Sequence, residues 1–434
     1  MSAAASPPGT EPLPKPTVLY RWVVLLFLSL AMFGNYYIFD SINPLVDIFK
    51  EQLGYSATVI GYLNSVYNAA AILALVAGGI IVDRFGTKKS ITIFAALCLI
   101  ASVWMIVSGQ AWSMLAARFV LGLGAEPLIV AVTTALAKWF KGKELSFAFG
   151  VNLLIARAAS WLADNTATWA PWSFDGTWYR PLYIGVAAGG ICVGAAITYW
   201  VLEAMGEKRF TVGEAAATDK LKIRDAFVFG RTFWYIVALC VTFYATVFSF
   251  RLFGIDYFMF AHAKTRETAG QLNGFLPLMA MWATPLFGLL ADKVGKRATF
   301  MLLGSALMPV VFLMMGYSTI TLWLPVGMLG VAFSLIPAIM WPSVAYLVEE
   351  RRLGSAYALM TLCQQVGWLG MNQAIGYSQD AFKAGEQNPA GYLPMLWTFA
   401  LLSLMGFVFA WLLWRRETGP DGHALESIRP RSTA

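Results

Sequence analysis

Two stretches of the sequence that are long enough to cross a membrane each hold one ionisable residue well inside their apolar part. Glu126 lies in the stretch 112–138 and Arg157 in the stretch 145–170. A charge in the lipid interior costs about 3 kcal/mol or more unless it faces a cavity or a partner, so both residues are candidate functional groups. Only a short polar hinge, residues 138–144, separates the two stretches. The sequence therefore predicts antiparallel neighbouring helices that can bring an acid and a base together.

The neighbours of Glu126 also indicate a functional position. Gly122 and Gly124 precede it and reduce the bulk of the helix, while Pro127 follows it and leaves a backbone carbonyl without its helical partner. An acid in this setting is expected to line a transport pathway. Arg118, earlier in the same stretch, is expected instead to stabilise helix packing.

The residues that follow Arg157 form a polar stripe. Ser160, Trp161 and Asp164 stand at i+3, i+4 and i+7, which places them on one face of a helix. A single arginine could be locked in a structural ion pair, but a whole stripe favours a wall that faces a water-filled cavity. The planar guanidinium group of Arg157 suits a carboxylate because it binds both oxygens at once.

Asp40 is a third candidate, late in the first apolar stretch. Tyr36 and Tyr37 stand at i−4 and i−3, so we expect them on the same side of the helix. A carboxylic acid flanked by aromatic rings could bind a proton or an ammonium group. The alternative is a structural hydrogen bond near the helix end, because Asn43 and Pro44 follow directly.

The second half of the chain contributes one buried cation. Tyr244, Phe248 and Arg251 share a helix face, and Asp256 lies near the end of the same stretch. Arg251 is expected to be either a second contact for an anion or the ion-pair partner of Asp256 or Asp40.

Uncharged polar side chains in two later stretches complete the candidate site. Amides and indoles suit the polar backbone of a small ligand, although hydrogen bonds between helices would explain the same residues. The predicted substrate-binding residues are Tyr36, Tyr37, Asp40, Glu126, Arg157, Trp161, Arg251, Trp341, Gln364, Gln365, Trp368 and Asn372.

Composition indicates that lipid surrounds most of the chain. Of the 434 residues, 59% are hydrophobic and 13% are charged, whereas about a quarter of the residues in a soluble domain are charged. The net charge of +7 is spread over short loops and forms no single patch, which argues against nucleic-acid binding. The four cysteines lie in apolar stretches without metal-ligand or redox spacing.

Catalytic motifs are missing from the sequence. Neither a G-x-S-x-G turn nor a phosphate-binding glycine-lysine loop is present, and His262 and His423 lie far apart in a loop and a tail. We therefore expect no enzyme activity, no cofactor and no metal site, and we expect transport without ATP.

Apolar stretches predict about twelve membrane spans. They lie near 19–48, 57–82, 90–108, 112–138, 145–170, 180–203, 231–257, 268–291, 298–316, 319–347, 354–380 and 391–414. The predicted organisation is a disordered tail 1–18, a six-helix half 19–203, a polar linker 204–230, a second six-helix half 231–414 and a tail 415–434. The fold class is thus an all-α membrane protein with twelve transmembrane helices in two halves.

Basic residues in alternate loops predict the topology. They concentrate near 84–89, 138–143, 293–297, 351–352 and 415–416, whereas the loops after the third and ninth spans carry no charge. Because short cytoplasmic loops collect Lys and Arg, both termini are predicted to be cytoplasmic.

An internal repeat supports the division into halves. The run 79–89 recurs as 288–297, each time after the second span of its half. Such repeats are typical of secondary transporters with a binding site at the midplane. We interpret the repeated residues as a gate, although they could be topology signals only. The predicted gating residues are Gly79, Asp83, Arg84, Gly86, Gly288, Asp292, Lys293 and Gly295.

These motifs resemble a known family. The paired loops, the run Arg118–Gly124 and the six-plus-six layout are similar to the major facilitator superfamily over nearly the whole chain. The segments 124–128, 139–145 and 149–157, with Trp341-Pro342 in the second half, resemble the branch of major facilitator superfamily domain-containing protein 1.

The resemblance implies a dipeptide transporter that works by alternating access, with Glu126 and Arg157 lining the central site. Arg251 departs from the branch, where a neutral residue is expected, and this leaves acidic peptides or organic anions open as substrates. Some members of the branch are lysosomal with a glycoprotein partner. The N-terminal tail here has no acidic dileucine signal, so we expect a bacterial inner or plasma membrane.

Taken together, the residues predict a secondary carrier for small zwitterions, dipeptides by preference. Glu126, with Asp40, would hold the ammonium group, and Arg157, with Arg251, the carboxylate. Trp161, Trp341 and Trp368 would close over the ligand, while Gln364 and Asn372 would bind the peptide amide. The expected partners are a small solute and the lipid bilayer, with the chain acting as a monomer. The alternatives are an organic anion or dicarboxylate exchanger and a transport-inactive receptor or scaffold.

Overall fold

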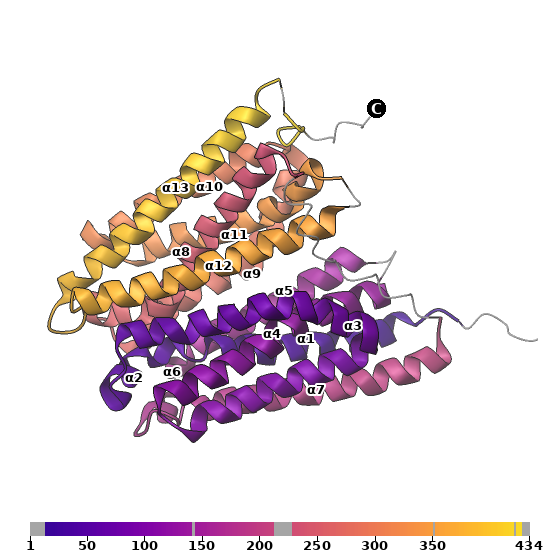
Figure 1. Ribbon diagram of the computed structural model, residues 1–434, viewed down its shortest axis with the longest axis horizontal. Helices are drawn as coiled ribbons and strands as arrows, with labels where there is room; N and C mark the ends of the chain where they lie inside the picture. Colours follow the sequence, from indigo (N-terminus) through magenta and orange to yellow (C-terminus); the bar gives the residue numbers. More distant parts are fainter. Residues whose placement is uncertain (1–13, 141–143, 212–227, 350–351, 421, 428–434) are drawn as a thin grey trace, which may run out of the picture.

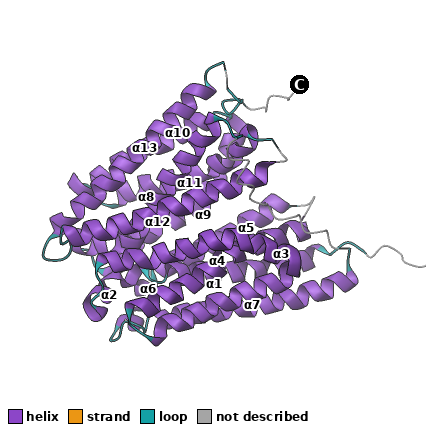
Figure 2. Cartoon of the chain, in the orientation of Figure 1, coloured by secondary structure: helices purple, strands orange, loops and turns teal. Residues whose placement is uncertain are grey.

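The structure is a computed structural model that describes residues 14–140, 144–211, 228–349, 352–420 and 422–427. Within these residues the chain is helical and forms no β-strand. Two bundles of helices lie side by side, one from each half of the chain (Figure 1), and short loops connect the helices (Figure 2). Residues 1–13 of the predicted tail and 212–227 of the predicted linker lie outside the described part.

The first bundle is built from residues of the N-terminal half. Its elements are α1 (Val18–Asp40), η1 (Asn43–Leu45), α2 (Val46–Leu53), α3 (Ala57–Val107), α4 (Ala111–Phe140), α5 (Leu145–Asp164), α6 (Thr166–Trp169), η2 (Pro171–Phe174) and α7 (Leu182–Arg209). The second bundle contains α8 (Arg231–His262), α9 (Arg266–Val294), α10 (Arg297–Tyr317), α11 (Trp323–Leu347), α12 (Leu353–Ala381), η5 (Pro389–Tyr392) and α13 (Leu393–Glu417).

The long helix α3 contains two of the predicted spans. Gly86 interrupts it with φ 77° and ψ 169°, a backbone conformation that favours glycine. The chain reverses at this kink, so that the predicted spans 57–82 and 90–108 become neighbouring helical segments.

Ten helical segments of the described part are long and apolar enough to cross a membrane. Two further helices, α5 and α12, are less apolar but contain 20 and 29 residues. A helix of about 20 residues spans about 30 Å, the thickness of the hydrocarbon layer. The twelve predicted spans are thus all helical, and the two least apolar ones carry the polar stripes seen in the sequence.

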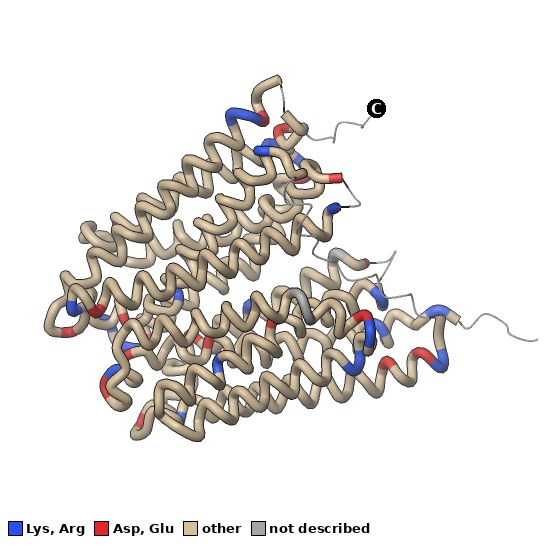
Figure 3. The backbone as a smooth tube through the Cα atoms, in the orientation of Figure 1, with Lys and Arg blue, Asp and Glu red and all other residues tan. Residues whose placement is uncertain are grey.

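The two ends of the molecule differ. The terminal end holds Val18, the α9–α10 loop and Glu417, and the opposite end holds α2, η2 and η5. Charged residues gather near both ends and are sparse between them (Figure 3). The two halves lie close together at the opposite end and diverge toward the terminal end (Figure 1).

Glycines allow the halves to make close backbone contact near the opposite end. A Cβ atom at Gly61 of α3 would collide with the carbonyl oxygen of Asn372 on α12, and one at Gly376 with the carbonyl oxygen of Ala57. The helices α9 and α5 are in similarly close backbone contact, because a Cβ atom at Gly270 would collide with the carbonyl oxygen of Asp164. Small residues at such crossings permit tight helix packing in a membrane.

The helices α4 and α5 make fewer contacts with each other than the short hinge between them predicts. The helix α5 packs mainly against α1 and α9 and only slightly against α4. A short connection fixes two helix ends, but it does not prevent a third helix from lying between their middles. Here α1 packs against both α4 and α5, and Glu126 and Arg157 lie apart on the wall of one cavity. Residues 141–143 of the hinge lie outside the described part.

Candidate functional site

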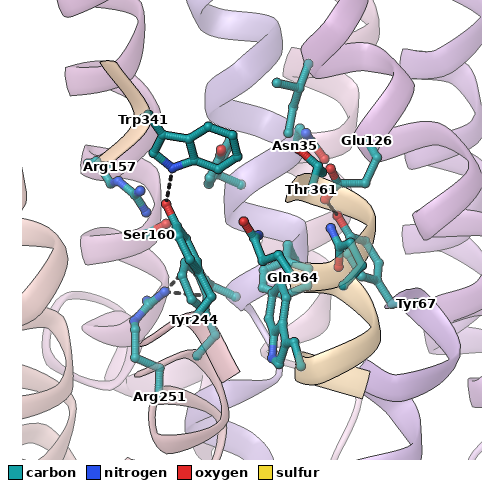
Figure 4. Close-up of a pocket in the computed structure, with 17 residues that line it drawn as sticks. Asn35, Tyr67, Glu126, Arg157, Ser160, Tyr244, Arg251, Trp341, Thr361 and Gln364 are labelled. Atoms are coloured by element: carbon teal, nitrogen blue, oxygen red, sulfur yellow. Dashed lines mark hydrogen bonds and ion pairs between the residues drawn. The ribbon is translucent and has the colours of Figure 1, made fainter. Parts of the chain in front are cut away.

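A cavity of about 260 Å³ lies between the two halves. Its wall comes from α1, α3, α4 and α5 of the first half and from α8, α11 and α12 of the second (Figure 4). The lining residues are Asn35, Tyr36, Phe39, Asp40, Tyr67, Glu126, Ile129, Arg157, Ser160, Tyr244, Phe248, Arg251, Trp341, Thr361, Gln364, Gln365 and Trp368.

Most of the predicted substrate-binding residues lie on this wall. Those that do are Tyr36, Asp40, Glu126, Arg157, Arg251, Trp341, Gln364, Gln365 and Trp368. They come from six helices far apart in the sequence, and the fold brings them to one place.

Three predicted residues lie elsewhere. Tyr37 turns away from the cavity and shares a hydrogen bond of 2.8 Å with Thr166. Trp161 packs against α9 beside Gly274. Asn372 is buried, and its amide oxygen accepts a hydrogen bond of 2.8 Å from Ser249. These side chains contribute to helix packing and do not line the cavity.

Arg157 offers an unused hydrogen-bond donor to the cavity. Its guanidinium carbon lies 5.1 Å from the centre of the Phe333 ring, a cation–π contact. Its Nη1 atom is buried and has no hydrogen-bond partner. Because an unsatisfied donor on a buried charged group is costly, this atom is placed for a ligand that the cavity admits.

Glu126 lies on the other side of the cavity from Arg157 (Figure 4). Its Oε1 atom accepts a hydrogen bond of 3.0 Å from the hydroxyl group of Tyr67. An ionised carboxylate can accept several hydrogen bonds, so this contact leaves capacity for a cationic group. The cavity therefore presents an acid and a base from opposite walls.

Aromatic side chains form the walls between the two charges. Tyr244 stacks on Phe248 with ring centres 5.5 Å apart and accepts a hydrogen bond of 3.0 Å from Nε1 of Trp341. Phe248 also contacts Trp368 at 4.7 Å, and Nε1 of Trp368 is buried without a partner. This indole and the free Oε1 atom of Gln365 are a donor and an acceptor suited to a peptide amide.

Arg251 is engaged in an ion triad at the closed end of the cavity. Its Nη1 atom lies 3.2 Å from Asp40 Oδ1, and its Nη2 atom lies 2.8 Å from Asp164 Oδ2. Asn43 donates hydrogen bonds of 3.2 Å and 2.9 Å to the same two carboxylates. Of the two ion-pair partners that the sequence left open, Asp40 is confirmed, whereas Asp256 pairs with Lys50 at 2.7 Å.

The triad also changes the interpretation of the stripe on α5. Arg157 and Ser160 line the cavity, as a wall predicts. Asp164, further along the same helix, instead pairs with Arg251 of the second half, which the sequence did not predict.

Several lining residues were missed in the sequence. Two of them, Asn35 and Phe39, stand directly beside the predicted residues Tyr36 and Asp40. Tyr67 shares a helix face with the polar Asn64, and Thr361 stands within one turn of Gln364. Thr361 is the clearest case, because it precedes Gln364 and Gln365 at i−3 and i−4 and continues their face by a turn.

The repeated loops at the terminal end show features of helix ends. Gly295 ends α9 with φ 71°, as Gly86 interrupts α3. Asp292 pairs with Arg297 of its own half at 2.8 Å. Gly288 has open space beside it, so no helix approaches it closely in this conformation. The gating role of the predicted residues thus stays a prediction.

Arg118 connects three helices of the first half. It is fully buried, donates to the carbonyl oxygen of Phe39 at 3.1 Å and bonds Asn64. Its guanidinium carbon lies 5.0 Å and 5.4 Å from the rings of Phe39 and Tyr67. These contacts describe the packing role that the sequence predicts.

Polar contacts fasten the halves at the opposite end. The Asp380 carboxylate accepts bonds of 2.8 Å from the backbone N–H groups of Ala57 and Thr58, at the first turn of α3. Arg266 of α9 binds Asp47 of α2 through two hydrogen bonds. With the Arg251 triad and the Lys50–Asp256 pair, they close this end of the cavity.

No group of three or more His, Cys, Asp or Glu residues in the described part is arranged to hold a metal ion.

The fold and the cavity define the class of protein: a membrane transporter with two six-helix halves around a central site. The chain belongs to the Major Facilitator Superfamily, whose family model matches residues 28–371. Human lysosomal dipeptide transporter MFSD1 (Homo sapiens) is 29% identical over 433 residues, which cover 96% of this chain and 91% of the relative. The protein of the same name from Danio rerio is 28% identical and covers 83% of this chain and 80% of its own length.

Solved structures show the same fold. A bacterial homologue of the human lysosomal transporter Spinster, in an inward-facing and unoccupied conformation, superimposes with a TM-score of 0.74 at 16% identity, covering 96% of this chain and 100% of that one. The nucleoside transporter NupG gives a TM-score of 0.70 at 14% identity, covering 91% and 99%. The predicted fold and family are thus confirmed, and the protein is a transporter and not an enzyme.

Proposed function

We propose that the protein is a secondary carrier for small zwitterions, with dipeptides as the preferred substrates. The observation that carries this proposal is the pair Glu126 and Arg157, an acid and a base on opposite walls of one cavity, with Nη1 of Arg157 buried and unpartnered. The similarity to human MFSD1, which is described as a dipeptide transporter, supports the same substrate class.

The chemistry of a dipeptide matches the cavity. The ammonium group would bind Glu126 and the carboxylate would bind Arg157, whose fork can hold both oxygens. The peptide amide would lie between Trp368 Nε1 and Gln365 Oε1, which are both buried and unpartnered. A single amino acid carries the same charges but brings no amide to these two atoms, so it should bind more weakly.

Alternating access would expose this site to each side of the membrane in turn. The halves are fastened at the opposite end, so we propose that this conformation opens toward the terminal end. Lys and Arg collect in the loops of that end, which supports the proposal that it faces the cytoplasm. A bacterial inner membrane or a plasma membrane is the proposed location, and a monomer contains the whole site.

Binding to the purified protein tests the substrate class. We expect a neutral dipeptide to raise the melting temperature, and a single amino acid or a dicarboxylate to raise it less. Glu126→Gln and Arg157→Ala should remove the dipeptide effect while the ligand-free melting temperature stays close to that of the wild type. Glu267→Gln is the matched control, because Glu267 is an exposed acid far from the cavity wall.

Stabilisation by dicarboxylates alone would contradict the proposal and favour an organic anion carrier. The structure gives that alternative little support, because Arg251, the second arginine it requires, already binds Asp40 and Asp164. Uptake of a labelled dipeptide into liposomes then distinguishes a carrier from a receptor that binds without transport.

A further inference from the structure

A second cavity of about 260 Å³ lies between the start of α8 and the end of α13, at the terminal end of the molecule. Both helices belong to the second half, and they pack against each other. None of the residues that line this second cavity lines the central one, so it is a separate site. Its lining residues are Tyr235, Leu412, Arg415, Arg416, Gly419 and Pro420.

The two arginines of the second cavity have unused hydrogen-bonding capacity. Neither forms an ion pair with another residue in the part of the chain that the structure describes. The Nε atom of Arg416 is buried and has no hydrogen-bond partner among these residues. The guanidinium carbon of Arg415 lies 5.6 Å from the centre of the Trp411 ring, a cation–π contact that leaves the N–H donors free. Unpaired donors on adjacent cations favour an anionic ligand.

The acid that follows these arginines in the sequence does not neutralise them. The side chain of Glu417 is fully buried, and its Oε2 atom accepts hydrogen bonds of 2.8 Å and 3.2 Å from the backbone N–H groups of His423 and Leu425. Its Oε1 atom lies 2.9 Å from Nδ1 of His423. No acid lines the cavity, whereas Arg231, one turn before Tyr235 on α8, adds a basic residue on the same helix face. The cavity is therefore positively charged.

A stripe of exposed apolar side chains leads along α13 to this cavity. Its members stand three or four residues apart, which places them on one helix face that continues to Arg415. In a membrane such a face contacts lipid, and the arginine at its end lies at the level of the headgroups. An acyl chain that follows the stripe brings its headgroup to the cavity. The stripe consists of Trp397, Leu401, Leu404, Val408 and Trp411.

We propose that the second cavity binds the phosphate group of an anionic phospholipid. Arg415 and Arg416 hold the phosphate oxygens. The hydroxyl group of Tyr235, which forms no hydrogen bond within the described part of the chain, donates to the same group. A zwitterionic headgroup fits less well, because its cationic group meets basic side chains and no acid. A free phosphate ion offers the same oxygens but makes no contact with the stripe. This inference does not depend on the substrate of the central cavity.

A pair of basic residues also ends the last helix of the first half, and it provides a matched control. Lys208 and Arg209 are exposed in the last turn of α7, as Arg415 and Arg416 stand in the last turn of α13. The two pairs are equivalent as topology signals and as partners of a helix dipole. Of the two pairs, only the one on α13 lines the second cavity. The double variant K208Q/R209Q is therefore the control for R415Q/R416Q.

Native mass spectrometry of the purified protein measures the binding. Titration with dioleoylphosphatidylglycerol gives the apparent Kd of the first bound lipid. We expect R415Q/R416Q to weaken this binding about 30-fold, and Y235F to weaken it about tenfold. K208Q/R209Q should stay close to the wild type. Dioleoylphosphatidylcholine has the same acyl chains without net charge, and it should bind more weakly and without dependence on the two arginines.

Three results would overturn the proposal. Equal weakening in R415Q/R416Q and K208Q/R209Q would show that surface charge alone attracts the lipid. Inorganic phosphate that binds through the two arginines, while dioleoylphosphatidylglycerol does not, would replace the lipid by a free ion. R415K/R416K and Y235F keep the test valid if R415Q/R416Q does not fold, because R415K/R416K preserves both charges but loses the planar fork. Wild-type affinity in both of these variants would exclude the site.

Discussion

Two clusters of buried charge lie along the interface between the halves, and they are made of the same chemical groups. In the cavity, Glu126 and Arg157 face each other across open space, and a guanidinium nitrogen has no partner. At the closed end, Arg251 is matched by two carboxylates. A buried charge by itself therefore does not identify a ligand site. A charge with unused hydrogen-bonding capacity indicates a ligand site, whereas a charge neutralised by opposite charges, as in the Arg251 triad, indicates a lock, meaning an ion cluster that holds the two halves together.

The two clusters differ in energy because one contains an unpaired buried donor and the other contains paired charges. A buried donor without a partner costs about 1–3 kcal/mol or more, so Arg157 is retained at the expense of stability. A buried ion pair has little net effect on stability, but removing one partner leaves an uncompensated charge. Substitutions in the Arg251 triad should therefore mainly lower stability, whereas substitutions of Arg157 should mainly lower dipeptide uptake.

The largest expected effect is on the lock. Arg251→Leu leaves Asp40 and Asp164 without their cation, and we expect a loss of about 3–5 kcal/mol in the stability of the closed arrangement. The measurement is the thermal unfolding temperature in detergent. Adding Asp164→Leu should recover part of the loss, since one of the two unpaired carboxylates is then gone; a double variant less stable than Arg251→Leu alone would contradict this.

The second expected effect is on the ligand site. Arg157→Leu removes a charged contact that forms only with substrate, so dipeptide uptake should fall roughly 100-fold, equivalent to about 2.7 kcal/mol. The unfolding temperature should hold or rise, because an unsatisfied donor is removed. Arg157→Lys should retain more uptake than Arg157→Leu. If Arg157→Leu unfolds as readily as Arg251→Leu, the distinction between the clusters fails.

Much of this architecture could be predicted from the sequence, because hydropathy and charge report the solvent of each helix. The twelve spans follow from apolar runs, and Glu126 and Arg157 follow from the cost of charge in lipid. Asp40 was among the predicted partners of Arg251, but the second partner was missed: Asp164 stands 87 residues away on a helix of the other half. Sequence spacing predicts contacts along one helix, but it does not predict which helices cross.

Sequence spacing also does not predict which of two neighbouring side chains faces the cavity. Tyr36 lines the cavity, whereas Tyr37 bonds Thr166, because consecutive helical side chains point about 100° apart. Both fit the pattern with Asp40, and only the packing of α1 against α5 selects one. Trp161 likewise shares a stripe with Arg157, yet it lies against α9.

A third effect concerns the glycines that let the halves close around the lock. Gly376→Ala places a methyl group against the carbonyl oxygen of Ala57, where overpacking costs about 1–3 kcal/mol. Only the closed state should be destabilised. Spin labels at E51C and E386C, exposed positions on the two halves, should therefore report a larger fraction of open molecules, with a longer distance between the labels. Gly370→Ala on the same helix is the control, since its Cβ atom would meet nothing within 4 Å. Equal shifts in both variants would mean that helix propensity, not contact between halves, sets the effect.

The smallest effect is expected at a partly buried acid whose carboxylate oxygens already accept hydrogen bonds within the protein. Glu426 accepts bonds of 2.8 Å and 2.7 Å from the backbone N–H and hydroxyl groups of Thr299, at the first turn of α10. Glu426→Gln keeps the shape and weakens these bonds, so it should cost about 1 kcal/mol of stability and leave dipeptide uptake unchanged. Uptake that falls as far as in Arg157→Leu would show that an acid with local partners can still control transport. The number of partners alone would then no longer separate structural charges from functional ones.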